Sequence, residues 1–351
     1  MLFCAYLYER LSEQRLSDYF DQAKQVMNGK RLIKNAKQRT IEKHKYELQN
    51  MNDNIRFLKN IINDKQLVLH NYDKCMFFNL YFDKIYVLNL DRQPDKWNRT
   101  KTHLEQHYLF DDVRFAGIDG KKPENVTKWN NHITEMKKKY RAKSVEQLPF
   151  GKYIPTTGSY AILESVRNIL LDAKHNRYEM VVIFQDDVVL HNQFCQKFHK
   201  FYLNNIVKPQ NDEWKIIYLG ASQHEWSDEL SIQSQQYYVP IGTTDGAFGL
   251  ILHERVYDEL LDEISKMETS IDSGALSNIQ RKSYDIYKEK CVNQHQSSNS
   301  HPNPQVMVCY PNLVISDVST SDLRKPRSMI ETAKQFRWNL NDYDIKERTF
   351  Y

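Results

Sequence analysis

The sequence predicts an α/β fold in which a central, mostly parallel sheet is flanked by helices and preceded by a helical segment. From residue 84 onward, short apolar runs alternate with longer stretches whose apolar residues recur at helical spacing. Several runs are apolar throughout, as expected of strands covered on both faces. Residues 1–74 contain no Pro and one Gly, which favours helix. We therefore divide the chain into a helical, coiled-coil-like segment, 1–75, and an α/β domain, 76–351.

Apolar residues in the helical segment recur at alternating spacings of seven, three and four. They are Ile41, Leu48, Met51, Ile55, Leu58 and Ile62. This spacing is typical of the seam of a short coiled coil or helical hairpin, and equally of an amphipathic helix packed on its own domain. We expect a homodimer through these helices. Light scattering tests this, because a chain without residues 1–74 should then be monomeric, whereas a monomer at full length contradicts it.

The elements of the α/β domain follow from the same patterns. We expect strands at 84–90, 113–120, 180–190, 214–220 and 306–317, helices at 94–108, 158–176 and 283–291, and a strand followed by a helix within 246–264. Pro94 suits the first turn of its helix. The polar stretch 294–305 is predicted to be a loop.

Composition and charge narrow the class of protein. There are 49 Lys and Arg against 45 Asp and Glu, a net charge of +4, which gives no reason to expect a nucleic-acid partner. Five cysteines stand far apart and form no zinc pattern, so we expect reduced thiols. The sequence shows no signal peptide and no apolar run of eighteen residues, which predicts a cytoplasmic protein without a transmembrane segment.

Two adjacent aspartates interrupt the apolar run 181–190. Asp186 and Asp187 follow VVIF and precede VVL. In open α/β sheets, ligands bind beyond the carboxyl ends of the strands. Adjacent carboxylates repel one another and need a divalent cation, a basic partner or solvent. The apolar flanks favour a metal, and such a cation would neutralise a nucleotide-diphosphate leaving group.

Seven short motifs occur in order across residues 80 to 325, and together the chain resembles glycosyltransferase family 25. The motifs are IYVLNLDRQPDKW, VRFAGIDGKK, VVIFQDDVVL, WKIIYLG, GAFGLILHERVYDEL, SYDIY and VISDVSTSDLR. This family includes bacterial lipooligosaccharide galactosyltransferases and procollagen galactosyltransferases. The resemblance implies a GT-A type fold and an inverting, metal-dependent transfer of galactose or glucose from a UDP-sugar. The acceptor would be a glycan or a hydroxylysine-type side chain.

The resemblance also implies roles for individual residues. The metal, Mn²⁺ or Mg²⁺, would be held by Gln185, Asp186 and Asp187, the last acting as a catalytic residue. The donor would contact Asn89, Arg92, Lys96, Asp119 and Asp186. Independently of the resemblance, Asp245 and Gly246 could contact the donor sugar, because glycines let the backbone approach a ligand closely. Asp285 would take the proton from the acceptor hydroxyl, unless it is only the N-cap of a helix. Asp245 is also explained as a turn residue. Trp226 could stack on a sugar, whereas Trp214 and Trp338 are expected to be packed.

Departures from the family pattern leave a second function open. Gln185 replaces the family's Glu, Lys96 replaces a preferred Arg, and the Ser-His pair that begins the family's central helix is absent. The alternative is a weak or inactive member that binds a glycan or a protein partner. A nucleotidyltransferase is disfavoured, because no Gly-rich phosphate loop follows the first strand.

Overall fold

The computed structural model describes residues 78, 81–107, 109, 112–149, 151–226, 232–233, 236–294, 302–321, 326–343 and 345. The chain divides into two units, Met1–Lys74 and Cys75–Tyr351. The predicted N-terminal helices, their apolar seam and the homodimer lie outside the described residues. Every described residue belongs to the second unit.

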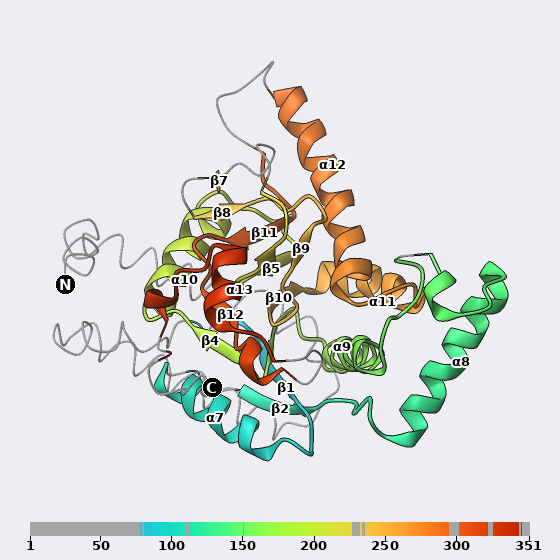
Figure 1. The fold of residues 1–351 in the computed structure, drawn as a ribbon. Helices are drawn as coiled ribbons and strands as arrows, with labels where there is room; N and C mark the ends of the chain where they lie inside the picture. Colours follow the sequence, from blue (N-terminus) through green and yellow to red (C-terminus); the bar gives the residue numbers. More distant parts are fainter. Residues whose placement is uncertain are drawn as a thin grey trace, which may run out of the picture. The chain divides into compact units, whose positions relative to one another are not determined.

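An eight-stranded mixed sheet forms the centre of the described unit (Figure 1). Its order is β2 (Asp112–Ala116), β1 (Lys84–Asn89), β3 (Met180–Gln185), β10 (Gly249–His253), β5 (Ile216–Tyr218), β11 (Val306–Cys309), β8 (Tyr237–Tyr238) and β7 (Ile232–Gln233). Only β10 and β8 run against the direction of the other strands. The expected mostly parallel sheet is therefore confirmed.

Two short ribbons and seven helices of the described part complete the unit. The ribbons pair β4 (Val188–Leu190) with β12 (Val314–Ser316) and β6 (Ser222–Gln223) with β9 (Thr244–Asp245). The helices are α7 (Pro94–Gln106), α8 (Pro123–Tyr140), α9 (Thr157–Asn176), α10 (Phe194–Tyr202), α11 (Tyr257–Ser265), α12 (Ser277–Gln294) and α13 (Met329–Phe336). Short helical turns include η4 (Asp272–Leu276) and η5 (Val318–Thr320).

Both faces of the sheet are buried, because alternate side chains of each strand enter different cores. Val87 of β1 packs in one core with Leu104 of α7 and with α10. Tyr86 and Leu88 pack in the other core with the apolar side of α9, including Val166. The strands can be apolar throughout because neither face meets water.

A topological switch point lies between β1 and β3. The chain leaves β1 through α7 and reaches β2 on one side, then returns through α8 and α9 to β3 on the other side of β1. The chain leaves the carboxyl end of β1 towards β2, whereas the large-sheet strands that follow β3 lie on the opposite side of it, so the connections diverge at the carboxyl ends of β1 and β3. Such a divergence is where open α/β sheets bind ligands.

The structure corrects the prediction of one strand over residues 180–190. β3 ends at Gln185, Asp186 and Asp187 form a turn, and the chain resumes as β4, which pairs with β12 outside the large sheet. Because the aspartates turn the backbone, the second apolar run enters a core from a different ribbon. This break could not be read from hydrophobicity, since both flanks are equally apolar.

Three other expectations can be compared with the described residues. The helix predicted from residue 158 is confirmed as α9. The N-cap explanation for Asp285 is wrong, because α12 begins at Ser277. The prediction of reduced thiols is wrong for Cys195, which is in a disulfide, whereas Cys291 and Cys309 are free. In the described part, no helix is both long and apolar enough to span a bilayer.

Candidate functional site

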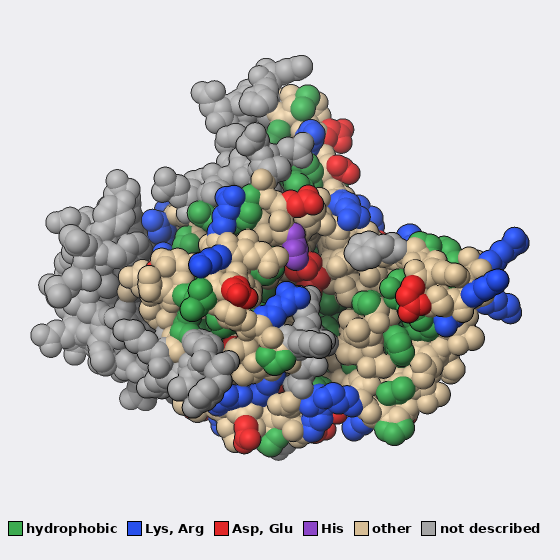
Figure 2. All heavy atoms as spheres, viewed as in Figure 1, with side chains coloured by type: hydrophobic (Ala, Val, Ile, Leu, Met, Phe, Trp, Pro, Cys, Tyr) green, Lys and Arg blue, Asp and Glu red, His purple; other side chains and the backbone are tan. Residues whose placement is uncertain are grey.

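Three segments meet beside the switch point and carry most of the predicted site. They are the end of β1, the turn that follows β3, and the loop between β9 and β10. In the sheet Leu88 pairs with Gln185 and Phe184 with Gly249, so the three segments lie side by side. Figure 2 shows acidic, basic and histidine side chains gathered around a hollow in one face of the molecule.

The carboxylate of Asp186 is held by the end of β1. Asn89 donates from Nδ2 to Asp186 Oδ2 at 2.6 Å. From α7, the hydroxyl of Thr100 donates to the backbone carbonyl of Asp186 at 2.6 Å. The turn is therefore anchored at both its side chain and its backbone, so this carboxylate has a defined direction.

Asp187 is anchored on the other side by β12. Ser316 donates its hydroxyl to Asp187 Oδ2 at 2.8 Å, and the amide of Asp317 donates to the Asp187 carbonyl at 2.7 Å. Asp187 Oδ1 is buried without a hydrogen-bond partner, although the residue as a whole keeps partial exposure. A buried carboxylate oxygen without a donor is costly, which makes it a candidate ligand for a cation.

The pKa of Asp187 is raised to about 6 by its burial, and the neighbouring charge of Asp186 adds to this. The hydroxyl of Ser316 and the positive charge of Lys96 act in the opposite direction, and Asp317 raises the pKa further. Lys96 is itself buried in the first turn of α7. Its ammonium therefore lies within electrostatic reach of the turn, and its predicted contact with the donor stays a prediction.

Gln185 is hydrogen-bonded to the loop before β10, whereas Asp186 is hydrogen-bonded to the end of β1. Its Nε2 donates to the carbonyl of Ala247 at 3.3 Å, and its backbone amide donates to Phe248 at 3.1 Å. The side chain thus ties the end of β3 to the loop before β10. These contacts tie two segments together and use only the NH₂ end of the side chain, so the predicted metal contact through its carbonyl oxygen stays a prediction.

Arg92 and Asp119 pair with each other at the same edge. Arg92 Nε lies 2.8 Å from Asp119 Oδ2, and Asp119 Oδ1 accepts the backbone amide of Lys121 at 3.0 Å. Residues from the loops after β1 and β2 are thereby joined. The structure therefore brings together these two residues, which were predicted separately from the sequence.

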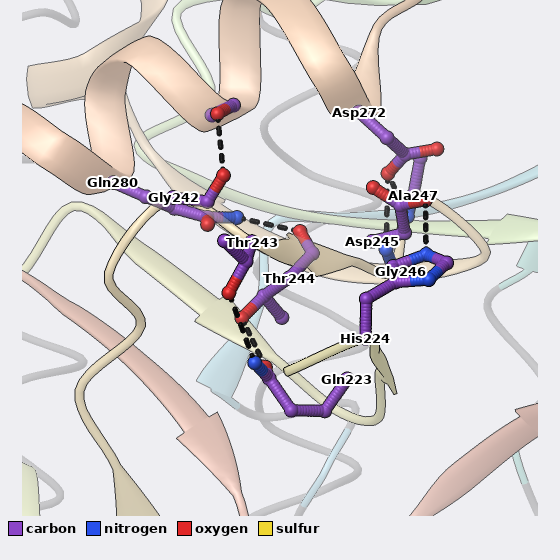
Figure 3. Close-up of polar contacts among 11 residues, drawn as sticks. Gln223, His224, Gly242, Thr243, Thr244, Asp245, Gly246, Ala247, Asp272 and Gln280 are labelled. Atoms are coloured by element: carbon purple, nitrogen blue, oxygen red, sulfur yellow. Dashed lines mark hydrogen bonds and ion pairs between the residues drawn. The ribbon is translucent and has the colours of Figure 1, made fainter. Parts of the chain in front are cut away.

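The segment from Gly242 to Ala247 is supported by a half-buried and a buried polar side chain (Figure 3). Asp272, at the start of η4, accepts the amides of Gly246 at 2.9 Å and Ala247 at 3.0 Å through Oδ1. Gln280 of α12, fully buried, donates to Thr244 O at 2.8 Å. At Gly246 a Cβ atom would lie 2.7 Å from Gly220 O, so only glycine fits.

Asp245 projects from this rigid loop and pairs with a histidine. His224 Nε2 lies 2.9 Å from Asp245 Oδ2, and His224 directly follows β6, which pairs with β9, the strand that ends at Asp245. Asp245 is therefore part of a defined polar pair and not an isolated turn residue. Its predicted contact with the donor sugar stays a prediction.

Asp285 lies apart from these contacts, exposed in the middle of α12. The buried side of that helix carries Gln280, Ser283 and Tyr287 instead. Trp226 packs against Tyr238, and the Arg337 guanidinium lies 5.0 Å from its ring centroid. Trp214 and Trp338 are buried, as predicted.

The side chains that could ligate a metal can be compared with the ligands that a divalent cation needs. In the described part, no group of three or more His, Cys, Asp and Glu side chains could hold a metal. Mg²⁺ and similar hard cations are commonly held by one or two carboxylates plus water and phosphate oxygens. Asp186 together with the unpartnered Asp187 Oδ1 fits that kind of site. A closed protein cage does not form among the described residues.

Four residues at this edge were missed from the sequence: Arg114, His224, Asp272 and Ser316. Arg114 donates from Nε to Asn89 Oδ1 at 2.8 Å and from Nη2 to Asp91 at 2.7 Å. Strand alternation in β2 could have placed Arg114 on the same face as Asn89. Asp272 and Ser316 carry no local signal, because their roles depend on pairing between distant segments.

Comparisons with known proteins add little to this geometry. No protein-family model matches the chain, and no curated protein matches it. Among solved structures, a mannose-1-phosphate geranyltransferase from Thermus thermophilus is similar over 64% of this chain and 72% of that one, with a TM-score of 0.23 and 10% identity. This likeness is too low to bear on function.

Proposed function

We propose that the chain is a glycosyltransferase of GT-A type that moves galactose or glucose from a UDP-sugar to a glycan or a hydroxylysine-type acceptor. One observation carries the proposal. Two adjacent carboxylates lie at the switch point of the sheet, and one oxygen of Asp187 is buried without a partner. The ordered motifs that resemble glycosyltransferase family 25 supply the substrate class.

Asp186 and Asp187 would hold Mn²⁺ or Mg²⁺, which would neutralise the charge that develops on the leaving diphosphate. Two basic side chains of the protein would also neutralise the charge of the diphosphate. Lys96 lies within electrostatic reach of Asp187, and Arg92, oriented by Asp119, offers a planar fork to a phosphate oxygen. Asp245 and Gly246, on a loop with many supports, would contact the donor sugar.

An inverting transfer also needs a carboxylate that takes the proton of the acceptor hydroxyl. The sequence suggests Asp285, which is exposed in α12. Asp272 is a second candidate, because its hydrogen bonds to Gly246 and Ala247 place it beside the loop that contacts Gln185. We expect Asp272→Asn to lower kcat by about 10²-fold or more and Asp285→Asn to leave it nearly unchanged. The reverse result would restore Asp285 as the base.

The proposal is tested by measuring UDP release from UDP-galactose, UDP-glucose and UDP-N-acetylglucosamine with Mn²⁺, followed by trials of saccharides and hydroxylysine peptides as acceptors. We expect turnover with a hexose donor and its loss in Asp187→Asn. A matched control is Asp212→Asn, an exposed loop carboxylate, which should keep full activity. Full activity of the Asp187 variant would remove the metal assignment.

A second function is supported by the contacts of Gln185. Its amide is engaged with Ala247, and the two aspartates form no larger group of metal-binding side chains in the described part. A chain of this kind could bind a glycan or a protein partner with little or no turnover. Calorimetry separates the two functions, since absence of UDP-sugar binding with and without Mn²⁺ would favour the second.

A further inference from the structure

Asn89 was predicted to contact the nucleotide, but its amide is already engaged inside the protein. Its Nδ2 donates to Asp186 Oδ2 at 2.6 Å and to Gln93 O at 3.0 Å, so both amide hydrogens are used. Its Oδ1 accepts Arg114 Nε at 2.8 Å. The residue is 1% exposed. Asn89 therefore has no donor left for a ligand.

The sheet explains why these three residues meet. Asn89 extends the side of β1 that carries Val87, and Arg114 pairs with Val87 in the register of β1 and β2. Asp186 comes directly after β3, two residues beyond Phe184, and Phe184 is likewise paired with Val87. Side chains two residues apart share a face of a strand, so all three converge on the side of the sheet covered by α7.

We propose that Arg114 is a positioning residue for the candidate cation site and acts on Asp186 through Asn89. An amide can be turned over without a change of shape, and only its hydrogen bonds decide which end faces a neighbour. Arg114 Nε can only donate, so it holds the carbonyl end of Asn89 towards itself. The NH₂ end must then face Asp186. Asp91, at 2.7 Å from Arg114 Nη2, keeps the guanidinium in place.

For the affinity of the site for Mn²⁺, a positioning role of Arg114 predicts a change opposite to the one expected from its charge alone. Arg114 is a cation near the carboxylates, so removing its charge should by itself tighten binding of Mn²⁺. If Arg114 positions Asn89, its loss leaves Oδ1 without that donor, so the amide is held only through Nδ2 and orients Asp186 less firmly. Partners of metal ligands typically contribute about 10- to 100-fold in affinity. The direction of the change therefore separates the two explanations.

Calorimetry of the full chain with Mn²⁺ alone tests the proposal. We expect Arg114→Gln and Asn89→Ala each to weaken binding about 10- to 100-fold, and the double variant no more than the weaker-binding single variant, because both act on one contact. Arg114→Lys keeps the charge but loses the fork, so it should also weaken binding. Arg167→Gln on α9, an exposed residue, is the control for charge. Unchanged or tighter binding in Arg114→Gln would overturn the proposal.

A second measurement does not depend on the proposed function. The side-chain NH₂ signals of Asn89 in an NMR spectrum should exchange slowly with solvent in the unaltered chain and quickly in Arg114→Gln. Arg114 keeps 29% of its side chain exposed, so the variant should fold. If the unaltered chain binds no Mn²⁺, the metal assignment fails, whereas the amide signals still decide the role of Arg114. Equal exchange in both proteins would refute that role.

Discussion

Asp187→Asn is expected to raise the free energy of unfolding by about 1–3 kcal/mol at pH 7 in the presence of a chelator, while turnover is lost. Burial and the charge of Asp186 raise the pKa of Asp187 to about 6 from 3.8. Each pKa unit corresponds to about 1.4 kcal/mol, so the gain in unfolding free energy of the Asn variant cannot exceed about 3 kcal/mol. The Asn side chain at position 187 has nearly the same shape as Asp but carries no charge, so the cost of burying a charge is removed.

The sign of the pH dependence follows from the raised pKa. Protonated Asp187 stabilises the folded chain, and this contribution is fully present below pH 3.8 and lost as the pH rises through about 6. The advantage of the Asn variant should therefore be about 1 kcal/mol smaller at pH 5 than at pH 8. Urea unfolding at both values measures it. An advantage that is independent of pH, or a loss of stability, would contradict the expectation.

Binding of Mn²⁺ should change the difference in unfolding free energy between Asp187→Asn and the unaltered chain. A ligand that binds only the folded state stabilises it by about 2.7 kcal/mol at one hundred times its dissociation constant. Because only the unaltered chain keeps both carboxylates, added Mn²⁺ should narrow or reverse the advantage of Asp187→Asn. Asp212→Asn, which alters an exposed carboxylate, should respond to Mn²⁺ as the unaltered chain does.

Gly220→Ala is expected to destabilise the chain by about 3 kcal/mol or more. A Cβ atom at this position would overlap the carbonyl oxygen of Val314 and lie 2.9 Å from its carbonyl carbon. These are backbone atoms of β12, so the clash cannot be relieved by a side-chain rotation, and overpacking of this kind commonly costs about 1–3 kcal/mol or more. Urea unfolding measures the loss.

The same substitution should also disturb the candidate site. β12 pairs with β4, with Ser316 opposite Val188, and Ser316 holds Asp187. A displaced β12 would therefore weaken the support of that carboxylate. Gly151→Ala is a suitable control, since its Cβ would meet no atom within 4 Å although its φ is +74°. It should cost only about 1–2 kcal/mol. Equal losses at both positions would contradict the role of the contact with Val314.

Much of the scaffold could be predicted because it depends on local periodicity. The apolar residues of α9 recur at helical spacing, and Val87 and its neighbours in β1 form an uninterrupted apolar run. The place of Asp186 and Asp187 at a strand end followed from the same reasoning. The break between β3 and β4 was missed, because two apolar flanks look alike whether they form one strand or two.

The site was predicted less completely, because its side chains find their partners far along the chain. The resemblance pointed to Asn89 as a contact of the donor, but its bond to Asp186 spans 97 residues and its bond to Arg114 spans 25. Asp272 reaches Gly246 across 26 residues. Such pairs depend on strand order and register, which a local pattern does not contain.

By itself, the sequence determined the alternation of strands and helices, the two buried faces of the sheet and the place of two aspartates near the carboxyl end of a strand, because spacing and polarity suffice for these. Only the tertiary structure decided which oxygen of Asp187 is left without a partner, which carbonyl the amide of Gln185 bonds and which residue donates to Asn89 Oδ1. The physical reason is the directionality of hydrogen bonds. A carboxylate or an amide gains its role from the groups that face it, and those come from β2, β12 and η4.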